Sequence, residues 1–182
     1  MAAGEKCVRQ PVYDHGAVLP GEVRTYLAPG AGGRYLDGTV GLGGHTGRIV
    51  EAAPGSVALG LDRDVSALAI AAERLKRFGD RAILRHSRFS EFAAHLDSLG
   101  WDAVDGALID IGVSSLQLDM PERGFSFLHD GPLDMRMDTT GGETGHVASP
   151  ASAMVNKAPF ETIRAIIARA GEEPQAGRID RA

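Results

Sequence analysis

Short apolar runs alternate with amphipathic stretches over the first 110 residues of the chain. The runs predict strands near residues 34–38, 57–61, 81–85 and 103–110, and the stretches predict helices near 44–53, 65–78 and 89–99, after a short helix within 17–27. This alternation is typical of an α/β fold with a parallel sheet and flanking helices. The clearest helix begins after Asp64, which we expect to be its N-cap.

The regular alternation stops beyond Asp110. Residues 112–150 show little periodicity and are rich in Gly, Pro, Asp and Ser. An irregular segment of this length in a compact protein is usually functional or disordered. Its apolar side chains favour an ordered loop around the carboxyl edge of the sheet, and we expect burial of Phe125, Phe127, Leu128, Leu133, Met135 and Met137. A further amphipathic helix is expected at about 159–170.

Composition restricts the class of protein. The chain has 182 residues, 43% of them hydrophobic and 24% charged, which is typical of a globular protein with one domain, or one domain and part of another. Its net charge of −5 argues against a free-standing nucleic-acid binder. Six basic residues gather in one segment, as either a local positive face or a solvated helix edge: Arg74, Lys76, Arg77, Arg81, Arg85 and Arg88.

The cysteine content and the length of the apolar runs indicate the cellular compartment and whether a metal site is expected. Cys7 is the only cysteine, so a disulfide framework within the chain is excluded. Cys7 and the six histidines lack the paired spacing of metal ligands. No signal-peptide core and no run of about 20 apolar residues occurs. We therefore expect a cytoplasmic protein with no membrane segment and no metal.

A glycine-dense turn follows the first expected strand, between Asp37 and His45. Glycine permits positive φ and lets backbone N–H groups approach a ligand, and the start of the next helix offers further unpaired N–H groups. A nucleotide-type cofactor with a carboxylate or phosphate is therefore the expected ligand. The alternative is a turn that only packs the helix on the sheet.

The spacing of this turn excludes two common cofactors. The third glycine of the dinucleotide fingerprint would fall at Thr46, and the nucleoside triphosphate loop needs Lys and Ser or Thr where Gly44 and His45 stand. Asp62 ends the second strand about 20 residues past the glycines, where an acid suits ribose hydroxyls. Together with Asp37, these features predict an S-adenosylmethionine site of the Rossmann-like, class I methyltransferase type.

Longer blocks resemble one family, the bacterial 16S ribosomal RNA cytosine-N4 methyltransferases called RsmH or MraW. The most specific blocks, Glu122 to Phe127 and Asp130 to Asp138, have a composition too unusual for chance agreement. The resemblance spans nearly the whole chain. Its other blocks are His15 to Val23, Asp37 to His45, Asp62 to Asp64, Asp105-Gly106, Asp110 to Ser115, Gln117 to Asp119, Val155-Asn156 and Gly171 to Glu173.

The resemblance implies a cofactor and a substrate. The substrate is a cytosine in the 16S rRNA of the small ribosomal subunit; the oligomeric state is left open, with a dimer as one option. Considered without the resemblance, three of the residues that it implies have other interpretations. Phe89 could be a core residue as well as a cover for adenine, and His45 is more often a capping or packing residue. Gln117 would be interpreted as a solvent-facing loop amide. The implied contacts to S-adenosylmethionine are Gly43, Gly44, His45, Asp62, Phe89, Asp110 and Gln117.

Asp110 is the expected catalytic residue. Amino-methyltransferases of this fold carry a short Asp/Asn/Ser-Pro-Pro-aromatic motif after the fourth strand, and Asp110 to Val113 occupy that place without the prolines. The carboxylate, or a neighbouring carbonyl, is expected to hold the N4 hydrogens so that the lone pair points at the methyl donor. The alternative is an acid that caps a loop. Arg123 and Arg136 are candidates to contact phosphates.

The resemblance divides the chain into a Rossmann-like core at 1–113, an ordered active-site loop at 114–150 and the beginning of an inserted helical domain at 151–182. Members of the family are longer, and the C-terminal strands of their fold are missing from this sequence. We therefore expect residues 103–110 to form an apolar sheet edge, and we expect this chain to bind S-adenosylmethionine weakly and to be inactive. The alternatives are a non-catalytic S-adenosylmethionine- or RNA-binding fragment, an amino-methyltransferase acting on DNA and, least favoured, an oxidoreductase.

Overall fold

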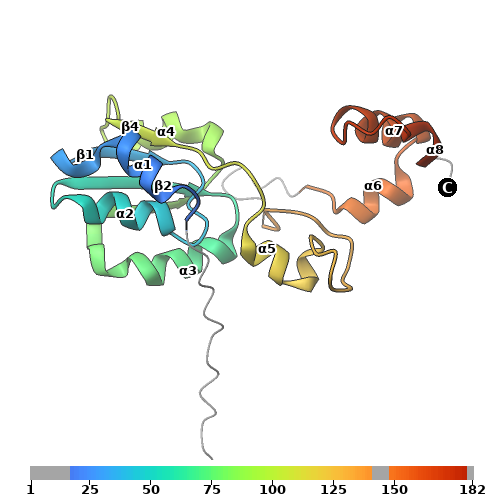
Figure 1. The fold of residues 1–182 in the computed structure, drawn as a ribbon, viewed down its shortest axis with the longest axis horizontal. Coiled ribbons are helices and arrows are strands. Elements are labelled where there is room, and N and C mark those ends of the chain that lie inside the picture. The colour runs from blue at the N-terminus through green and yellow to red at the C-terminus, as the bar shows by residue number, and fades with distance from the viewer. Residues whose placement is uncertain (1–16, 141–147, 180–182) are drawn as a thin grey trace, which may run out of the picture.

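A four-stranded parallel sheet forms the centre of the α/β body (Figure 1). The computed structural model describes residues 17–140 and 148–179, so Cys7 and His15 lie outside the described residues. The strand order β3-β2-β1-β4 confirms the Rossmann-like arrangement that the alternating pattern predicted. The strands are β1 (Gly33–Asp37), β2 (Ser56–Asp62), β3 (Ala82–His86) and β4 (Gly106–Leu108).

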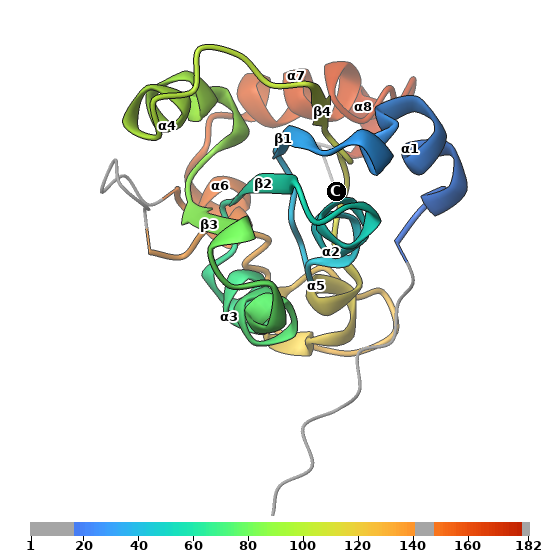
Figure 2. The same ribbon diagram turned by 90° about the vertical axis from the view of Figure 1, so that its left-hand side faces the viewer.

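Helices cover both faces of the sheet (Figure 2). On one face Tyr35 and Ala58 pack against Ile49 and Val50 of α2. The strand residues on the other face, among them Leu36, pack against α4 and Trp101. The helices of the body are α1 (Pro20–Leu27), α2 (Gly44–Ala52), α3 (Val65–Leu75) and α4 (Phe92–Ser98), with short 3₁₀ turns η1 (Pro29–Ala31), η2 (Lys76–Arg81) and η3 (Phe89–Glu91).

The fourth strand is shorter than the sequence predicted. β4 pairs with β1 alone among the described strands, so it lies at the sheet edge as expected. Its pairing ends near Leu108, whose carbonyl accepts a hydrogen bond from Gly38 N at 2.9 Å. Two residues later, the amide of Asp110 donates to a side chain, Thr39 Oγ1, at 2.7 Å. The chain thus leaves the sheet just where the expected catalytic residue stands.

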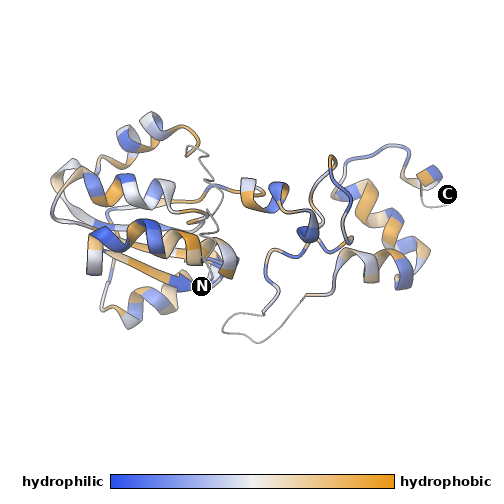
Figure 3. Ribbon diagram, turned by 90° about the horizontal axis from the view of Figure 1, so that it is seen from below, coloured by the Kyte–Doolittle hydropathy of each residue, from blue (hydrophilic) through white to orange (hydrophobic). Residues whose placement is uncertain are grey.

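The chain after β4 is mostly irregular and leads to a group of helices away from the sheet (Figure 1). The helix expected at 159–170 is confirmed as α7, and its residues alternate between hydrophobic and hydrophilic (Figure 3). Periodicity did not predict the helix that precedes it, which lies in the segment that the resemblance assigns to a helical domain. The elements of this part are α5 (Ser115–Asp119), η4 (Pro121–Arg123), α6 (Ala151–Lys157), α7 (Phe160–Arg169) and α8 (Ala176–Ile179).

The prediction that the apolar side chains of the irregular segment are buried is wrong for most of them. Phe127 is 104% exposed and Leu128 is 89% exposed, while Leu133 and Met135 are also exposed. Only Phe125 and Met137 are half-buried. The segment is ordered instead by polar contacts, such as the Ser126 hydroxyl that accepts the amides of Leu128 and His129. Backbone contacts of this kind shape a loop without a hydrophobic core beneath it.

Candidate cofactor site

A cavity of about 680 Å³ opens at the carboxyl ends of the strands. This is the edge where open α/β sheets bind ligands. Six of the seven residues predicted to contact a cofactor line it: Gly44, His45, Asp62, Phe89, Asp110 and Gln117. Residues from segments that are far apart in the sequence thus line one cavity, and folding brings these six predicted residues together.

The seventh predicted residue, Gly43, does not line the cavity. It has φ +85°, and a Cβ there would lie 3.1 Å from Leu75 Cδ1 of α3. Its role in the structure is therefore to let the turn pass close to α3. Gly44 does line the cavity, and a Cβ on it would lie 3.2 Å from Ala17 Cβ.

Asp62 holds the glycine turn. Its Oδ2 accepts the amide of Gly41 at 2.6 Å, and its Oδ1 accepts the amide of Asp64 at 2.9 Å. Burial raises the pKa of the Asp62 carboxyl above its usual value, although the backbone hydrogen bonds act in the opposite direction. Each carboxylate oxygen has a second acceptor site, so the side chain can support the turn and still accept hydroxyl donors from the cavity.

Asp37 supports the site from behind. Its fully buried carboxylate accepts the Thr46 hydroxyl at 2.6 Å and the Thr39 amide at 3.2 Å. Burial raises the pKa of this carboxyl, and the two hydrogen bonds offset part of that shift. Because Asp37 does not line the cavity, its function is to fix the end of β1 against α2.

Two nitrogens of the cavity wall are buried without a hydrogen-bond partner within the described chain, His45 Nδ1 and Arg63 Nε. Buried polar atoms in proteins are usually paired. The His45 side chain is only 7% exposed, on the first turn of α2. Unsatisfied nitrogens beside a glycine turn fit a polar ligand better than an apolar one.

Gln117 is buried, which contradicts the interpretation of a solvent-facing amide. Its side chain is only 4% exposed and its Oε1 accepts the amide of Ser114 at 3.1 Å. The Ser114 hydroxyl in turn accepts the amide of Gln117 at 3.3 Å, so the two residues form a capping box at the start of α5. The Gln117 Nε2 donates to Asp64 Oδ2 at 3.0 Å. The signal in the sequence was Ser114 followed three residues later by a glutamine.

Phe89 and Asp110 stand at the open part of the cavity. Phe89 is 43% exposed, so it is not a core residue of the described chain. Asp110 is also exposed, and its backbone, rather than its carboxylate, is tied to the body through Thr39. The Asp110 carboxylate is therefore accessible to a second molecule entering the cavity.

The basic residues that the sequence offered for phosphate contacts are largely engaged within the chain. Arg123 forms a buried ion pair with Asp64, and the Arg136 guanidinium pairs with Asp134 at 2.6 Å. The expectation that Arg123 meets phosphate is thus wrong, because its side chain is only 11% exposed. Arg81, in the basic segment, donates to the carbonyls of Val50 and Ala53 at the end of α2. In the same segment, the exposed Lys76 and Arg77 lie beside Glu73 and Glu51, so acidic neighbours offset their charge, which favours a solvated helix edge over a positive face.

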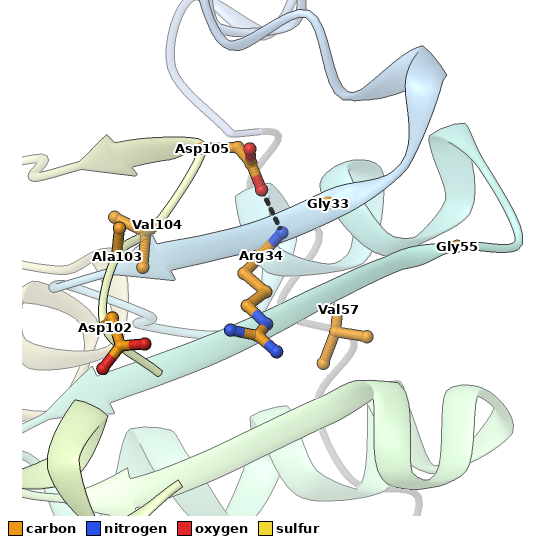
Figure 4. A pocket seen from close by; sticks show the side chains of 8 residues that line it. All are labelled: Gly33, Arg34, Gly55, Val57, Asp102, Ala103, Val104 and Asp105. Atoms are coloured by element: carbon orange, nitrogen blue, oxygen red, sulfur yellow. Dashed lines mark hydrogen bonds between the residues drawn. The ribbon is translucent and has the colours of Figure 1, made fainter. Parts of the chain in front are cut away.

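A second cavity, of about 530 Å³, lies at the amino ends of the strands (Figure 4). Figure 4 shows Asp105 accepting the amide of Arg34, a bond of 2.7 Å. None of the residues predicted to bind a cofactor lines this cavity. The predicted chemistry therefore belongs to the opposite edge.

The described ranges contain neither a membrane-spanning helix nor a metal-binding cluster. Over residues 17–140 and 148–179, no helix is long and apolar enough to span a bilayer. The same ranges hold no group of three His, Cys, Asp or Glu side chains arranged to bind a metal ion.

Comparisons with known proteins identify the family. Residues 12–182 match the model of the MraW methylase family. The chain is 58% identical over 168 residues to the ribosomal RNA small subunit methyltransferase H of Desulfovibrio desulfuricans, covering 92% of this chain and 50% of that protein. The protein of the same name from Nitratidesulfovibrio vulgaris (strain Miyazaki F) is 56% identical over 169 residues, covering 92% of this chain and 45% of the relative.

The solved structure of an rRNA methylase from Streptococcus thermophilus is 16% identical, with a TM-score of 0.34, over 40% of this chain and 46% of that one. The chain spans about half the length of the curated relatives it matches. A methylase family agrees with the methyl donor expected from the glycine turn, S-adenosylmethionine. The chain belongs to the MraW methylase family.

Proposed function

We propose that this chain carries the S-adenosylmethionine site of a methyltransferase that acts on the N4 amine of a cytosine in 16S ribosomal RNA. One observation carries the proposal: six residues predicted from the sequence line a single cavity at the carboxyl edge of the sheet. The cavity is large enough for a nucleoside-sized ligand, since small-molecule sites typically measure about 300–1,000 Å³.

The residues of the cavity fit the parts of the cofactor. The Asp62 carboxylate accepts the ribose hydroxyls, and Gly44 lets the backbone approach the methionine part. His45 Nδ1, buried and unpaired in the described chain, supplies a hydrogen-bonding atom beside the turn. Phe89, with nearly half of its surface open, covers the adenine ring. When bound, S-adenosylmethionine supplies an electrophilic methyl group on its sulfonium.

Asp110 orients the acceptor. The exocyclic amine of cytosine is a weak nucleophile because its lone pair is delocalised into the ring. The exposed Asp110 carboxylate accepts the N4 hydrogens and turns the lone pair toward the methyl group. The Asp110 carboxylate, or water beside it, would take up the proton that the amine loses when it accepts the methyl group. Orientation and charge, rather than a covalent intermediate, provide the acceleration.

The relatives named ribosomal RNA small subunit methyltransferase H support ribosomal RNA as the substrate class. The choice of cytosine N4 rests on the resemblance and on the acid after β4. An amine in a base stack is not accessible to the cavity, so the target cytosine must be flipped out or presented in a distorted region. The exposed Ile111, in the segment that follows β4, lines the cavity beside Asp110 and is available to contact such a base.

Titration and methylation assays test the proposal together. Calorimetry should detect S-adenosylmethionine binding to the purified chain. Small subunits that lack the modification should then acquire N4-methylcytosine, detected by mass spectrometry of the RNA. Asp110→Ala should lower the methylation rate by about 10²- to 10³-fold, whereas Asp110→Asn, which keeps an acceptor oxygen, should lose less. Full methylation by Asp110→Ala would exclude the assigned role.

A second candidate function is binding without catalysis. It is favoured by one observation: backbone amides hold the Asp62 carboxylate at the cofactor end of the cavity, whereas Asp110 is tied to the body through its backbone amide and not through its carboxylate. In that case calorimetry shows S-adenosylmethionine binding but the RNA gains no methyl group. Replacing the small subunit by double-stranded DNA in the same assay tests the DNA alternative, since DNA methylation by the chain would contradict the ribosomal assignment.

A further inference from the structure

The Asp64 carboxylate joins three parts of the molecule. The side chain is 4% exposed, and its Oδ1 accepts the amide of Ser66 at 3.0 Å, which caps α3 as predicted. Its Oδ2 accepts Gln117 Nε2 at 3.0 Å and lies 2.9 Å from Arg123 Nη2. Its backbone amide is held by Asp62. Asp64 is therefore two residues from Asp62, the proposed ribose ligand, and in contact with the loop that follows β4.

Arg123 completes the junction from the loop side. Its Nη2 also lies 3.1 Å from the carbonyl oxygen of Arg136 and 3.2 Å from that of Met137. Arg123 does not line the cavity, but three of the residues at this junction do, namely Asp64, Gln117 and Met137. One guanidinium group thus fixes the distance between Asp64, on the cofactor side of the cavity, and the loop that carries Met137.

The energetics of this pair favour a role in geometry. A buried ion pair adds little net stability, because desolvation of the two charges offsets their attraction. Removing one partner is costly, since it leaves the other charge buried and unpaired. All three contacts are made by one nitrogen, Nη2, so the Asp64 carboxylate and the two loop carbonyls are held around a single donor group. Such a residue orients its neighbours.

We propose that Arg123 is a positioning residue for the cavity. Through its ion pair with Asp64, it holds Gln117 and Met137 of the cavity wall in place relative to Asp62, the proposed ribose ligand. Arg123 touches neither cofactor nor RNA in this proposal. The inference rests on the proposed function, since it concerns the same cavity. It predicts that a substitution outside the cavity weakens cofactor binding, in contrast to a purely structural role, which would change only the stability of the fold.

Hydrogen–deuterium exchange of the free chain tests the anchoring. In Arg123→Gln, the amides of residues 115–123 and 133–137 should exchange faster, on the order of tenfold, while those of β1 and β2 stay unchanged. The matched control is Arg136→Gln, which removes a guanidinium from the same loop but breaks only its pair with Asp134. Equal exchange of 115–123 in Arg123→Gln and in the wild type would overturn the inference, whether or not the chain binds S-adenosylmethionine.

Calorimetric titration with S-adenosylmethionine tests the consequence. At a temperature where every variant is folded, Arg123→Gln should bind the cofactor on the order of fivefold more weakly, and Arg136→Gln should match the wild type. Arg123→Lys should recover part of the loss. An affinity of Arg123→Gln equal to that of a binding wild type overturns the inference but leaves the proposed function intact. A wild type that fails to bind refutes the proposed function, and the exchange result then decides the anchoring alone.

If Arg123→Gln does not fold, the double variant Asp64→Asn with Arg123→Gln removes both buried charges. Asparagine retains an oxygen that can cap α3, so this protein should fold. It should still show the faster exchange of the loop, because the tie between the loop and Asp64 is gone. Wild-type exchange in the folded double variant would overturn the inference.

Discussion

The two ends of the cavity differ in how their aspartates are held. At the glycine turn, both carboxylate oxygens of Asp62 accept backbone amides, and Asp37 and Asp64 beside it are buried. After β4, the carboxylate of Asp110 accepts no hydrogen bond within the described residues, and the neighbouring Ile111 is 80% exposed. The hydrogen-bond groups at the glycine turn are therefore preorganised before a ligand binds, whereas the Asp110 end is exposed and accessible.

This difference suits two ligands of different size. A small cofactor benefits from preorganised hydrogen-bond groups, because the cost of ordering them is met during folding. A large acceptor such as a folded RNA needs an accessible approach to the reacting group. The contrast also predicts different outcomes for substitutions at the two ends, which the following experiments measure.

The largest effect on cofactor binding is expected at the preorganised end. Asp62→Ala removes the acceptor of the Gly41 and Asp64 amides and of the proposed ribose hydroxyls. Loss of charge-assisted hydrogen bonds should weaken S-adenosylmethionine binding by about 3 kcal/mol, roughly a hundredfold. Calorimetric titration measures it. Asp62→Asn, with one acceptor oxygen retained, is the matched control, and similar affinities of Asp62→Ala and the wild type would remove the distinction between the ends.

A smaller effect is expected from the turn itself. Gly43→Ala places a Cβ at φ +85° and 3.1 Å from Leu75, so it adds a steric contact to backbone strain. It should lower the free energy of unfolding by about 2 kcal/mol, measured by urea denaturation. In Gly41→Ala, φ is +52° and a Cβ meets no atom within 4 Å, so only the strain, about 1 kcal/mol, remains. Equal losses in the two variants would mean that α3 does not confine the turn.

The buried Asp37, behind the glycine turn, should make the stability of the fold depend on pH. Burial raises the pKa of Asp37 in the folded protein above its unfolded value near 3.8, so the folded state binds the proton more tightly. The stability contributed by this group is therefore complete below that unfolded value and is lost as pH rises through the folded pKa. In Asp37→Asn this dependence should disappear, since the amide can accept from the Thr39 amide and donate to the Thr46 hydroxyl.

Urea denaturation at a series of pH values, from about 4 upward, compares the two proteins. The stability of the wild type relative to Asp37→Asn should fall as pH increases. A rise over that range would mean that the hydrogen bonds of Asp37, rather than its burial, determine its pKa.

The smallest effect on stability is expected in the exposed segment that follows β4. Phe127→Ala should change the free energy of unfolding by less than about 0.5 kcal/mol, because this side chain is fully exposed. A buried aromatic such as Tyr35, which is 2% exposed, should lose about 3 kcal/mol or more when changed to alanine. Thermal denaturation of both variants makes the comparison. A large loss in Phe127→Ala would show that the loop packs more tightly than its exposure indicates.

The regular part of the fold followed from local patterns. Hydrophobic periodicity predicted β1, β2, β3 and the helices between them. β1 and β2 bury apolar side chains, and the apolar sides of α2 and α3 pack against the strands. It overestimated the length of β4, because the end of that strand depends on a hydrogen bond from Asp110 to Thr39, 71 positions apart in the sequence. The exposure of Phe127 was also not predictable, because local hydrophobicity does not reveal whether a neighbouring element covers a side chain.

The residues of the candidate site were identified from the sequence through their types, their spacing and the family resemblance. Their convergence on one cavity came from the parallel sheet, which brings the carboxyl ends of its strands to one edge. The role of Arg123 was decided by the tertiary structure alone. The sequence offered a cation for phosphate, but a charge buried in the fold must find its counter-charge there, and only folding brings Asp64, 59 positions earlier in the numbering, to within 2.9 Å of it.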